Sequence, residues 1–124
     1  MARMSECSVQ LIGFIGNETI EVRTTRDGTP IVNLSISENV SVPGDEGEER
    51  EEKTFWHDAV ADGALAEKVI GKYARQGAYV FIRGVMRYRP VKSINKDGKE
   101  YNGREAYVKI REFRLLDAPP KNES

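Results

Sequence analysis

The chain has 124 residues, of which 39% are hydrophobic and 31% charged, with a single cysteine and a formal net charge of -1. This length fits one domain, and the composition excludes a disordered chain. No apolar run approaches the roughly 20 residues of a membrane helix, and the N-terminus lacks the apolar core of a signal peptide. Because Cys7 has no partner for a disulfide or a metal site, we expect a cytoplasmic protein.

Charge is distributed unevenly along the chain. Residues 1–70 hold 6 Lys+Arg against 14 Asp+Glu, a net charge of -8, whereas residues 71–124 hold 13 against 6, a net charge of +7. Much of the acid lies in residues 44–53. Binding of a polyanion depends on local basic surface rather than on global charge, so the second half of the chain is a candidate for such binding.

The first third of the chain predicts extended structure. Residues 8–24 are read as one long strand with a kink, because apolar residues are interrupted by glycines. The Asp-Gly pair within residues 26–30, followed by Pro30, predicts a hairpin turn. Residues 31–37 alternate apolar and polar side chains, which predicts a second strand with one buried face.

The middle of the chain predicts a loop, a strand and a helix. Residues 38–53 have no periodicity and contain the acidic cluster, so a solvated loop is expected. Residues 54–61 alternate again, which predicts a third strand. In residues 64–76 apolar side chains recur at helical spacing, with Asp62 as the expected N-cap and Gly77 as the left-handed terminator, and this predicts about three to four helical turns.

The last third predicts two more strands, over residues 79–89 and 106–115, joined by a long polar hairpin loop over residues 92–104. The resulting order of three strands, a helix and two strands is typical of the OB-fold, a five-stranded, partly open barrel with the helix between strands 3 and 4. We therefore expect an all-β domain over residues 1–116 and a flexible tail over residues 117–124.

Trp56 and a set of cations point to a single-stranded nucleic-acid site. Alternation in the third strand turns Trp56 away from the apolar face, and an exposed indole can stack on any base, at about 1–3 kcal/mol per base. Arg83, Arg87 and Arg89 share one face of the fourth strand, where they can contact phosphates. Lys92, Lys109 and Arg111 are expected to add to this basic surface. The alternative interpretations are a Trp56 that fills the core or a subunit contact, and cations that only keep a sheet edge solvated.

Motifs for catalysis are not found. His57 is the only histidine and has no second ligand at metal-binding spacing. Phosphate-binding loops, dinucleotide fingerprints and nucleophile elbows do not occur. The sequence therefore predicts no enzyme, no cofactor, no metal and no small-molecule substrate.

Several short motifs occur in an order and spacing that are specific to a family. They are Leu11-Ile12-Gly13-Phe14-Ile15-Gly16, Arg26-Asp27-Gly28-Thr29, Glu52-Lys53-Thr54-Phe55-Trp56-His57, Val80-Phe81-Ile82-Arg83-Gly84 and Arg87-Tyr88-Arg89. In these motifs the chain resembles the bacterial-type single-stranded DNA-binding proteins, from about Val9 to Leu116.

The resemblance implies an OB-fold, assembly as a homotetramer, and sequence-independent binding of single-stranded DNA in replication, recombination and repair. By the same resemblance Trp56 would stack on bases, His57 would hold subunits together, and Arg87 and Arg89 would contact phosphates. An interface built from Phe81, or from the first strand through Val9 and Leu11, would produce dimers or, repeated, tetramers.

The chain also departs from the family pattern. The positions of further stacking aromatics are occupied by Val40, Asp62 and Val91, and Asp58 and Asp62 share the outward side with Trp56. Carboxylates there would repel phosphate, so we expect weakened binding. Tyr88 would replace a lost aromatic only if its strand bulges. The usual acidic C-terminal tip of the family has no counterpart in residues 121–124.

Two other functions share the predicted fold. One is a protein-interaction module akin to the primosomal replication protein N, in which the sheet edges and the acidic loop bind replication proteins and DNA contact is secondary. The other is a nuclease on an OB-fold, which the position of the acids in a loop disfavours.

Overall fold

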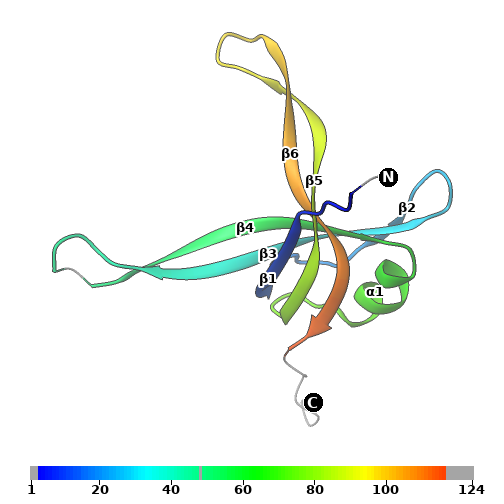
Figure 1. Ribbon diagram of the computed structural model, residues 1–124, viewed down its shortest axis with the longest axis horizontal. Coiled ribbons are helices and arrows are strands. Elements are labelled where there is room, and N and C mark those ends of the chain that lie inside the picture. Colours follow the sequence, from blue (N-terminus) through cyan, green and yellow to red (C-terminus); the bar gives the residue numbers. More distant parts are fainter. Residues whose placement is uncertain (1–2, 48, 117–124) are drawn as a thin grey trace.

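The computed structural model describes residues 3–47 and 49–116, and the predicted tail, residues 117–124, lies outside them. The described chain forms six strands and one helical segment between the fourth and fifth strands (Figure 1). The strands are β1 (Ser8–Ile15), β2 (Val22–Thr24), β3 (Pro30–Val42), β4 (Glu51–Asp62), β5 (Tyr79–Ile94) and β6 (Glu100–Leu115). The helical segment is a π-helix (Leu65–Ile70) that continues into α1 (Gly71–Tyr73).

Five of the strands close into a ring. The sheet order is β1-β5-β6-β4-β3-β2, and β1 also pairs with β3. Two of the strand pairings that close the ring are short. The parallel β4–β6 joint has two residue pairs, Ala59–Val108 and Val60–Lys109, and the β1–β3 joint consists of Phe14–Ser37 and Ile15–Ile36. The prediction of an OB-fold with a partly open five-stranded barrel is confirmed, with β2 as an additional short strand on the edge of β3.

The core lies inside this ring. Alternate residues of β3 point inward, and Val32, Leu34 and Ile36 are at most 2% exposed. Ala66 and Ile70 of the helical segment belong to the same apolar cluster. Burial of these side chains is the main favourable contribution to folding, and it fixes which residues of each strand face outward.

Two hairpin arms project from the barrel, and here the loop predictions are wrong. Of residues 38–53, predicted as a loop, only 43–50 lie between the strands, because β3 continues to Val42 and β4 begins at Glu51. Of residues 92–104, only 95–99 lie between β5 and β6. Both arms are largely exposed on both faces and carry no sustained apolar period for a sequence reading to detect. Backbone pairing, which is indifferent to side-chain polarity, still forms them.

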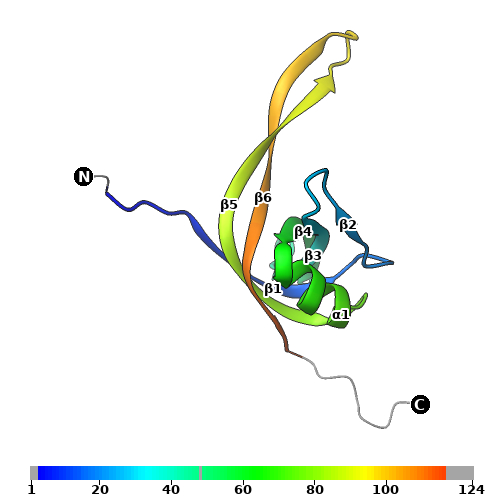
Figure 2. The same cartoon turned by 90° about the vertical axis from the view of Figure 1, so that its right-hand side faces the viewer.

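The arms leave the barrel in different directions. In Figure 1 the β3–β4 arm and the β5–β6 arm diverge widely from the barrel, and Figure 2 shows the β5–β6 arm extended while the β3–β4 arm is seen nearly end-on. A fork therefore separates β4 from β6 beyond their short parallel joint.

The first strand and the helix also differ from prediction. The predicted long strand over residues 8–24 divides into β1 and β2. Just after β1, the Gly16 amide donates a hydrogen bond to the Ser35 carbonyl (2.8 Å). The Ser35 amide in turn donates to Asn17 Oδ1 (2.8 Å). The helix ends at Tyr73 rather than Gln76, and Ala64, not Asp62, occupies its N-cap without a side-chain hydrogen bond.

A β-bulge interrupts the β5–β6 ladder next to the barrel. Arg83 is paired with Glu112 and Gly84 with Ile110, so Arg111 is the extra residue of β6. Beyond a bulge the inward and outward positions of a strand exchange. This explains why Ile110 and Phe113, three residues apart, are both buried.

Candidate nucleic-acid interface

Trp56 lies on the outside of the barrel, as the alternation of β4 predicts. Its side chain is 60% exposed, whereas Ala59 and Ala61 on the other face are fully buried. The indole packs against Gly16, where an added Cβ would be 2.4 Å from the Trp56 Cζ3 atom. The indole thus rests on a residue without a side chain while the rest of it is open to solvent, as a stacking surface requires.

The strand register brings cationic side chains to the same side of the sheet. Val60 of β4 is the cross-strand partner of Lys109 on β6, and partners in register share a face of the sheet. Along the β5–β6 ladder, Arg87 is paired with Tyr107 and Arg89 with Glu105. One surface therefore joins Trp56 and its β4 neighbours with Arg87, Arg89, Tyr107 and Lys109, and we call this surface the outer face.

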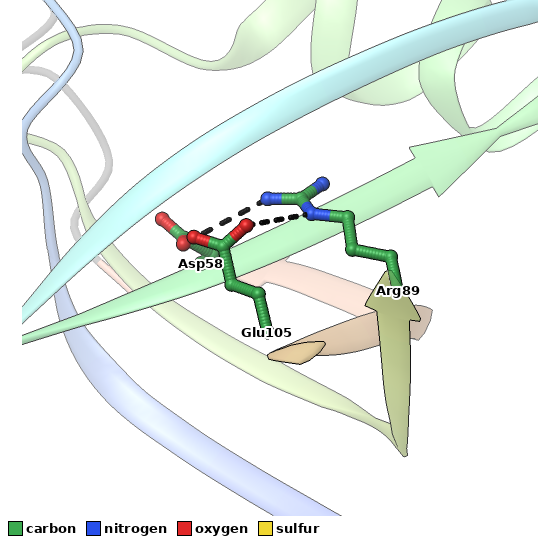
Figure 3. Close-up of polar contacts among 3 residues, drawn as sticks. All are labelled: Asp58, Arg89 and Glu105. Carbon is green, nitrogen blue, oxygen red and sulfur yellow. Dashed lines mark hydrogen bonds and ion pairs between the residues drawn. The ribbon is translucent and has the colours of Figure 1, made fainter. Parts of the chain in front are cut away.

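Carboxylates occupy part of this positive surface. Arg89 Nε lies 3.1 Å from Glu105 Oε2, and its Nη2 lies 3.9 Å from Asp58 Oδ2 (Figure 3). The same guanidinium stands over the Tyr107 ring, 5.3 Å from its centroid. Lys109 Nζ is 3.8 Å from Asp62 Oδ2. The two carboxylates that the sequence places beside Trp56 thus pair with cations of the outer face, and incoming phosphates must compete with them.

The other predicted cations of this sheet lie in different surroundings. Arg83 Nη2 is 2.7 Å from Glu112 Oε1. Arg87 donates from Nη1 to the backbone carbonyl of Met86 (3.0 Å) and stays exposed. Arg111 is exposed at the bulge, near Arg83 and away from the β5–β6 arm.

Tyr88 and Lys92 do not share the outer face. Between Gly84 and Ile94 the β5–β6 register contains no further irregularity, so strict alternation turns both side chains to the opposite face of the arm. There the Arg104 guanidinium stands 4.8 Å from the centroid of the Tyr88 ring. A bulge between Tyr88 and Arg87 would be needed to bring Tyr88 beside the arginines, but the bulge of this ladder lies earlier, at Gly84.

Two tyrosines of β6 were missed by sequence reasoning as parts of this surface. Tyr107 is partly buried under Arg89, and Tyr101 is 53% exposed. Tyr101 pairs with Ser93, so it shares the outer face, and it lies near Val91 across Gly103. The alternation of Tyr101, Gly103 and Tyr107 was present in the sequence, but its first two members fell inside residues 92–104, which were interpreted as a loop, whereas Tyr107 was placed in the last predicted strand.

The predicted interface residues lie around β1. His57 Nε2 is 2.8 Å from Glu38 Oε1, and both line a hollow of about 300 Å³ beside Leu11. Leu11 itself is 8% exposed and belongs to the core, although it also lines this hollow. Val9 and Phe81 are partly buried.

In residues 3–47 and 49–116 no group of three or more His, Cys, Asp or Glu side chains is placed to hold a metal ion. No helix in this part of the chain is long and apolar enough to cross a membrane.

Fold and surface together define a class of protein, an OB-fold with an aromatic and cationic outer wall. Residues 7–113 match the model of the single-strand binding protein family, and the chain belongs to this family. Proteins of this family are DNA-binding proteins without enzymatic activity, in agreement with the prediction from sequence.

Relatives in sequence and structure agree with this assignment. "Single-stranded DNA-binding protein 1" of Xylella fastidiosa is 31% identical over 115 residues, which cover 92% of this chain and 79% of that protein. A "Single-stranded DNA-binding protein" of Rhizobium meliloti is 38% identical over 81 residues, which cover 65% of this chain and 46% of that protein. The fold is similar to that in "Plasmodium falciparum SSB complex with ssDNA", with a TM-score of 0.76 at 22% identity, covering 94% of this chain and all of the other.

Proposed function

We propose that this protein binds single-stranded DNA without reading its sequence, in replication, recombination and repair. The observation that carries the proposal is the exposed Trp56 indole on the same outer face as Arg87 and Arg89. Bases stack on the indole, and guanidinium groups contact the phosphates on either side. The exposed Cys7 is consistent with work in a reducing cytoplasm.

The remaining candidate residues divide by their position. Lys109 lies on the outer face and is proposed to contact a phosphate. To do so, its ammonium group must give up the ion pair with Asp62. Arg83 and Arg111 would contact further phosphates of the bound strand on the other side of the bulge. Tyr88 and Lys92 can contact only a strand that passes to the other face of the arm.

Titration of the protein with an oligonucleotide of mixed sequence, at several salt concentrations, tests the proposal. Stacking on Trp56 quenches its fluorescence, and phosphate contacts make the affinity fall with salt, by a slope of about 0.7 per phosphate neutralised. Unchanged fluorescence together with salt-independent binding would contradict this mode. A protein-interaction module such as the primosomal replication protein N predicts neither signal.

We further propose that the protein assembles as a homo-oligomer through β1. Residues Ser8 to Gly13 of this strand pair with β5, whereas β3 pairs only with Phe14 and Ile15. Along Ser8 to Gly13, the edge of β1 that faces away from β5 is thus open to a strand from a second copy. Exposed Ile12 lies within this stretch. Mass measurement in solution is expected to show a dimer or tetramer, and a monomer at micromolar concentration would overturn the proposal.

Removal of the carboxylate that holds Arg89 is expected to tighten DNA binding. In Glu105→Gln the guanidinium loses its closest anionic partner (3.1 Å) and becomes available to phosphate. Exposed ion pairs contribute up to about 1 kcal/mol, so the affinity should rise by up to about fivefold, with a steeper salt dependence. Glu100→Gln at the tip of the same arm, which changes the net charge equally, is the control and should have a smaller effect. Equal effects of the two variants would show that only net charge matters.

The two exposed tyrosines of the β5–β6 arm form a matched pair. Tyr101 is 53% and Tyr88 56% exposed, but only Tyr101 lies on the outer face. Tyr101→Ala is expected to lower the affinity at least about fivefold through the loss of a stacking contact, and Tyr88→Ala is expected to leave it unchanged. Binding of a labelled oligonucleotide followed by anisotropy compares them. A loss in Tyr88→Ala would instead show that the strand wraps around the arm.

A further inference from the structure

The fork between β4 and β6 contains a hollow of about 200 Å³ beside Trp56. Asp58 of β4 and Tyr107 of β6 also line it. It exists because β4 and β6 pair only at Ala59 and Val60 before the two arms diverge. At about 30 Å³ per water molecule the space corresponds to roughly seven waters, which is enough for one base.

Asp58 lines this space, and its carboxylate keeps unused hydrogen-bonding capacity because its ion pair with Arg89 is long. Its side chain is 49% exposed, and its nearest cation is Arg89 Nη2 at 3.9 Å, beyond hydrogen-bonding distance. Glu105 makes the close contact to that guanidinium instead, and it does not line the hollow. Within the part of the chain that the structure describes, the 3.9 Å ion pair with Arg89 is the closest polar side-chain contact of the Asp58 carboxylate.

A carboxylate beside a stacked base distinguishes between bases. An ionised carboxylate only accepts hydrogen bonds. Cytosine, adenine and guanine carry exocyclic amino groups that donate, whereas thymine presents a carbonyl oxygen at the corresponding position. The ring N–H of thymine can donate, but it lies between two carbonyl oxygens that repel a carboxylate. In single strands the bases are open to such reading at these edges.

We propose that Asp58 makes the hollow beside Trp56 prefer amino-bearing bases over thymine. The inference rests on the proposed function, because it requires a base to stack on Trp56. Repulsion between Asp58 and the phosphates is a separate effect. It lowers affinity for every sequence alike, whereas contact with a base changes the ratio of affinities between sequences.

The test compares oligo(dC) with oligo(dT) of equal length at fixed salt and pH 8, where cytosine is neutral, in the whole protein and in Asp58→Asn. The measured quantity is the affinity for oligo(dC) divided by the affinity for oligo(dT). This ratio is expected to be higher in the wild-type protein than in the variant. Because the asparagine amide can both accept and donate, the ratio of the two affinities should fall about 3- to 10-fold in Asp58→Asn. Quenching of Trp56 fluorescence reports both titrations.

Glu105→Gln is the matched control. It removes another carboxylate from the same Arg89 but none from the hollow, so both affinities should rise together and their ratio should stay as in the wild type. An unchanged ratio in Asp58→Asn, or an equal change of ratio in Glu105→Gln, would overturn the inference while leaving the proposed function intact. Failure of the wild-type protein to bind either oligonucleotide would overturn both.

Discussion

Replacement of Trp56 by alanine is expected to lower the affinity for single-stranded DNA by about 5- to 150-fold. This range corresponds to a stacking contact of about 1–3 kcal/mol. Since the variant has no tryptophan, the measurement follows the anisotropy of a labelled oligonucleotide.

Trp56→Phe separates stacking from a general disturbance of the surface. Phenylalanine keeps an aromatic face over Gly16 and should retain part of the affinity. Denaturation by urea shows whether either variant has lost stability. An alanine variant that is as stable as the wild type and binds equally well would remove the indole from the site, and the proposed mode of binding with it.

Gly84→Ala is expected to lower the free energy of unfolding by about 1–3 kcal/mol or more, as overpacking of a closely packed site does. A Cβ on Gly84 would lie 2.1 Å from the backbone carbonyl oxygen of Lys109. This oxygen belongs to the neighbouring strand and cannot turn aside as a flexible side chain would. β5 and β6 must therefore separate at the bulge, where the ladder supports the outer face.

Gly103→Ala is the matched control within the same pair of strands. Its Cβ would make ordinary contacts of 3.8 Å with Tyr101 and Val91, and the change in unfolding free energy should stay within about 0.5 kcal/mol. Urea denaturation of both variants makes the comparison. Equal stability of the Gly84 and Gly103 variants would show that β5 and β6 leave room for a methyl group at the bulge.

Much of the barrel could be predicted from local patterns in the sequence. Residues 31–37 and 54–61 each have one apolar face, and a strand in this setting has only one way to bury it. The outward direction of Trp56 follows directly from the burial of Ala59 and Ala61. The helix was found in the right place, but its end was not, because the backbone already becomes extended at Ala74 (ψ 140°), three residues before Gly77 takes its positive φ.

The functional surface depends on contacts between distant parts of the chain. The contact of Arg89 with Glu105 and Asp58 joins three strands, and no local pattern specifies it. Likewise, the face on which Tyr101 lies depends on the bulge at Arg111 of β6, since one inserted residue reverses the direction of every side chain of that strand beyond it. The sequence identified the residue types needed for the site, but not their partners.

By itself, the sequence determined the family, the order of elements, the buried face of the barrel strands and the exposure of Trp56, because each of these follows from local alternation or from short motifs. Only the tertiary structure decided the length of the two arms, the pairing of the cations with carboxylates and the hollow at the fork. These features arise from backbone pairing and from charges brought together across strands. Neither leaves a periodic signal in the order of the amino acids.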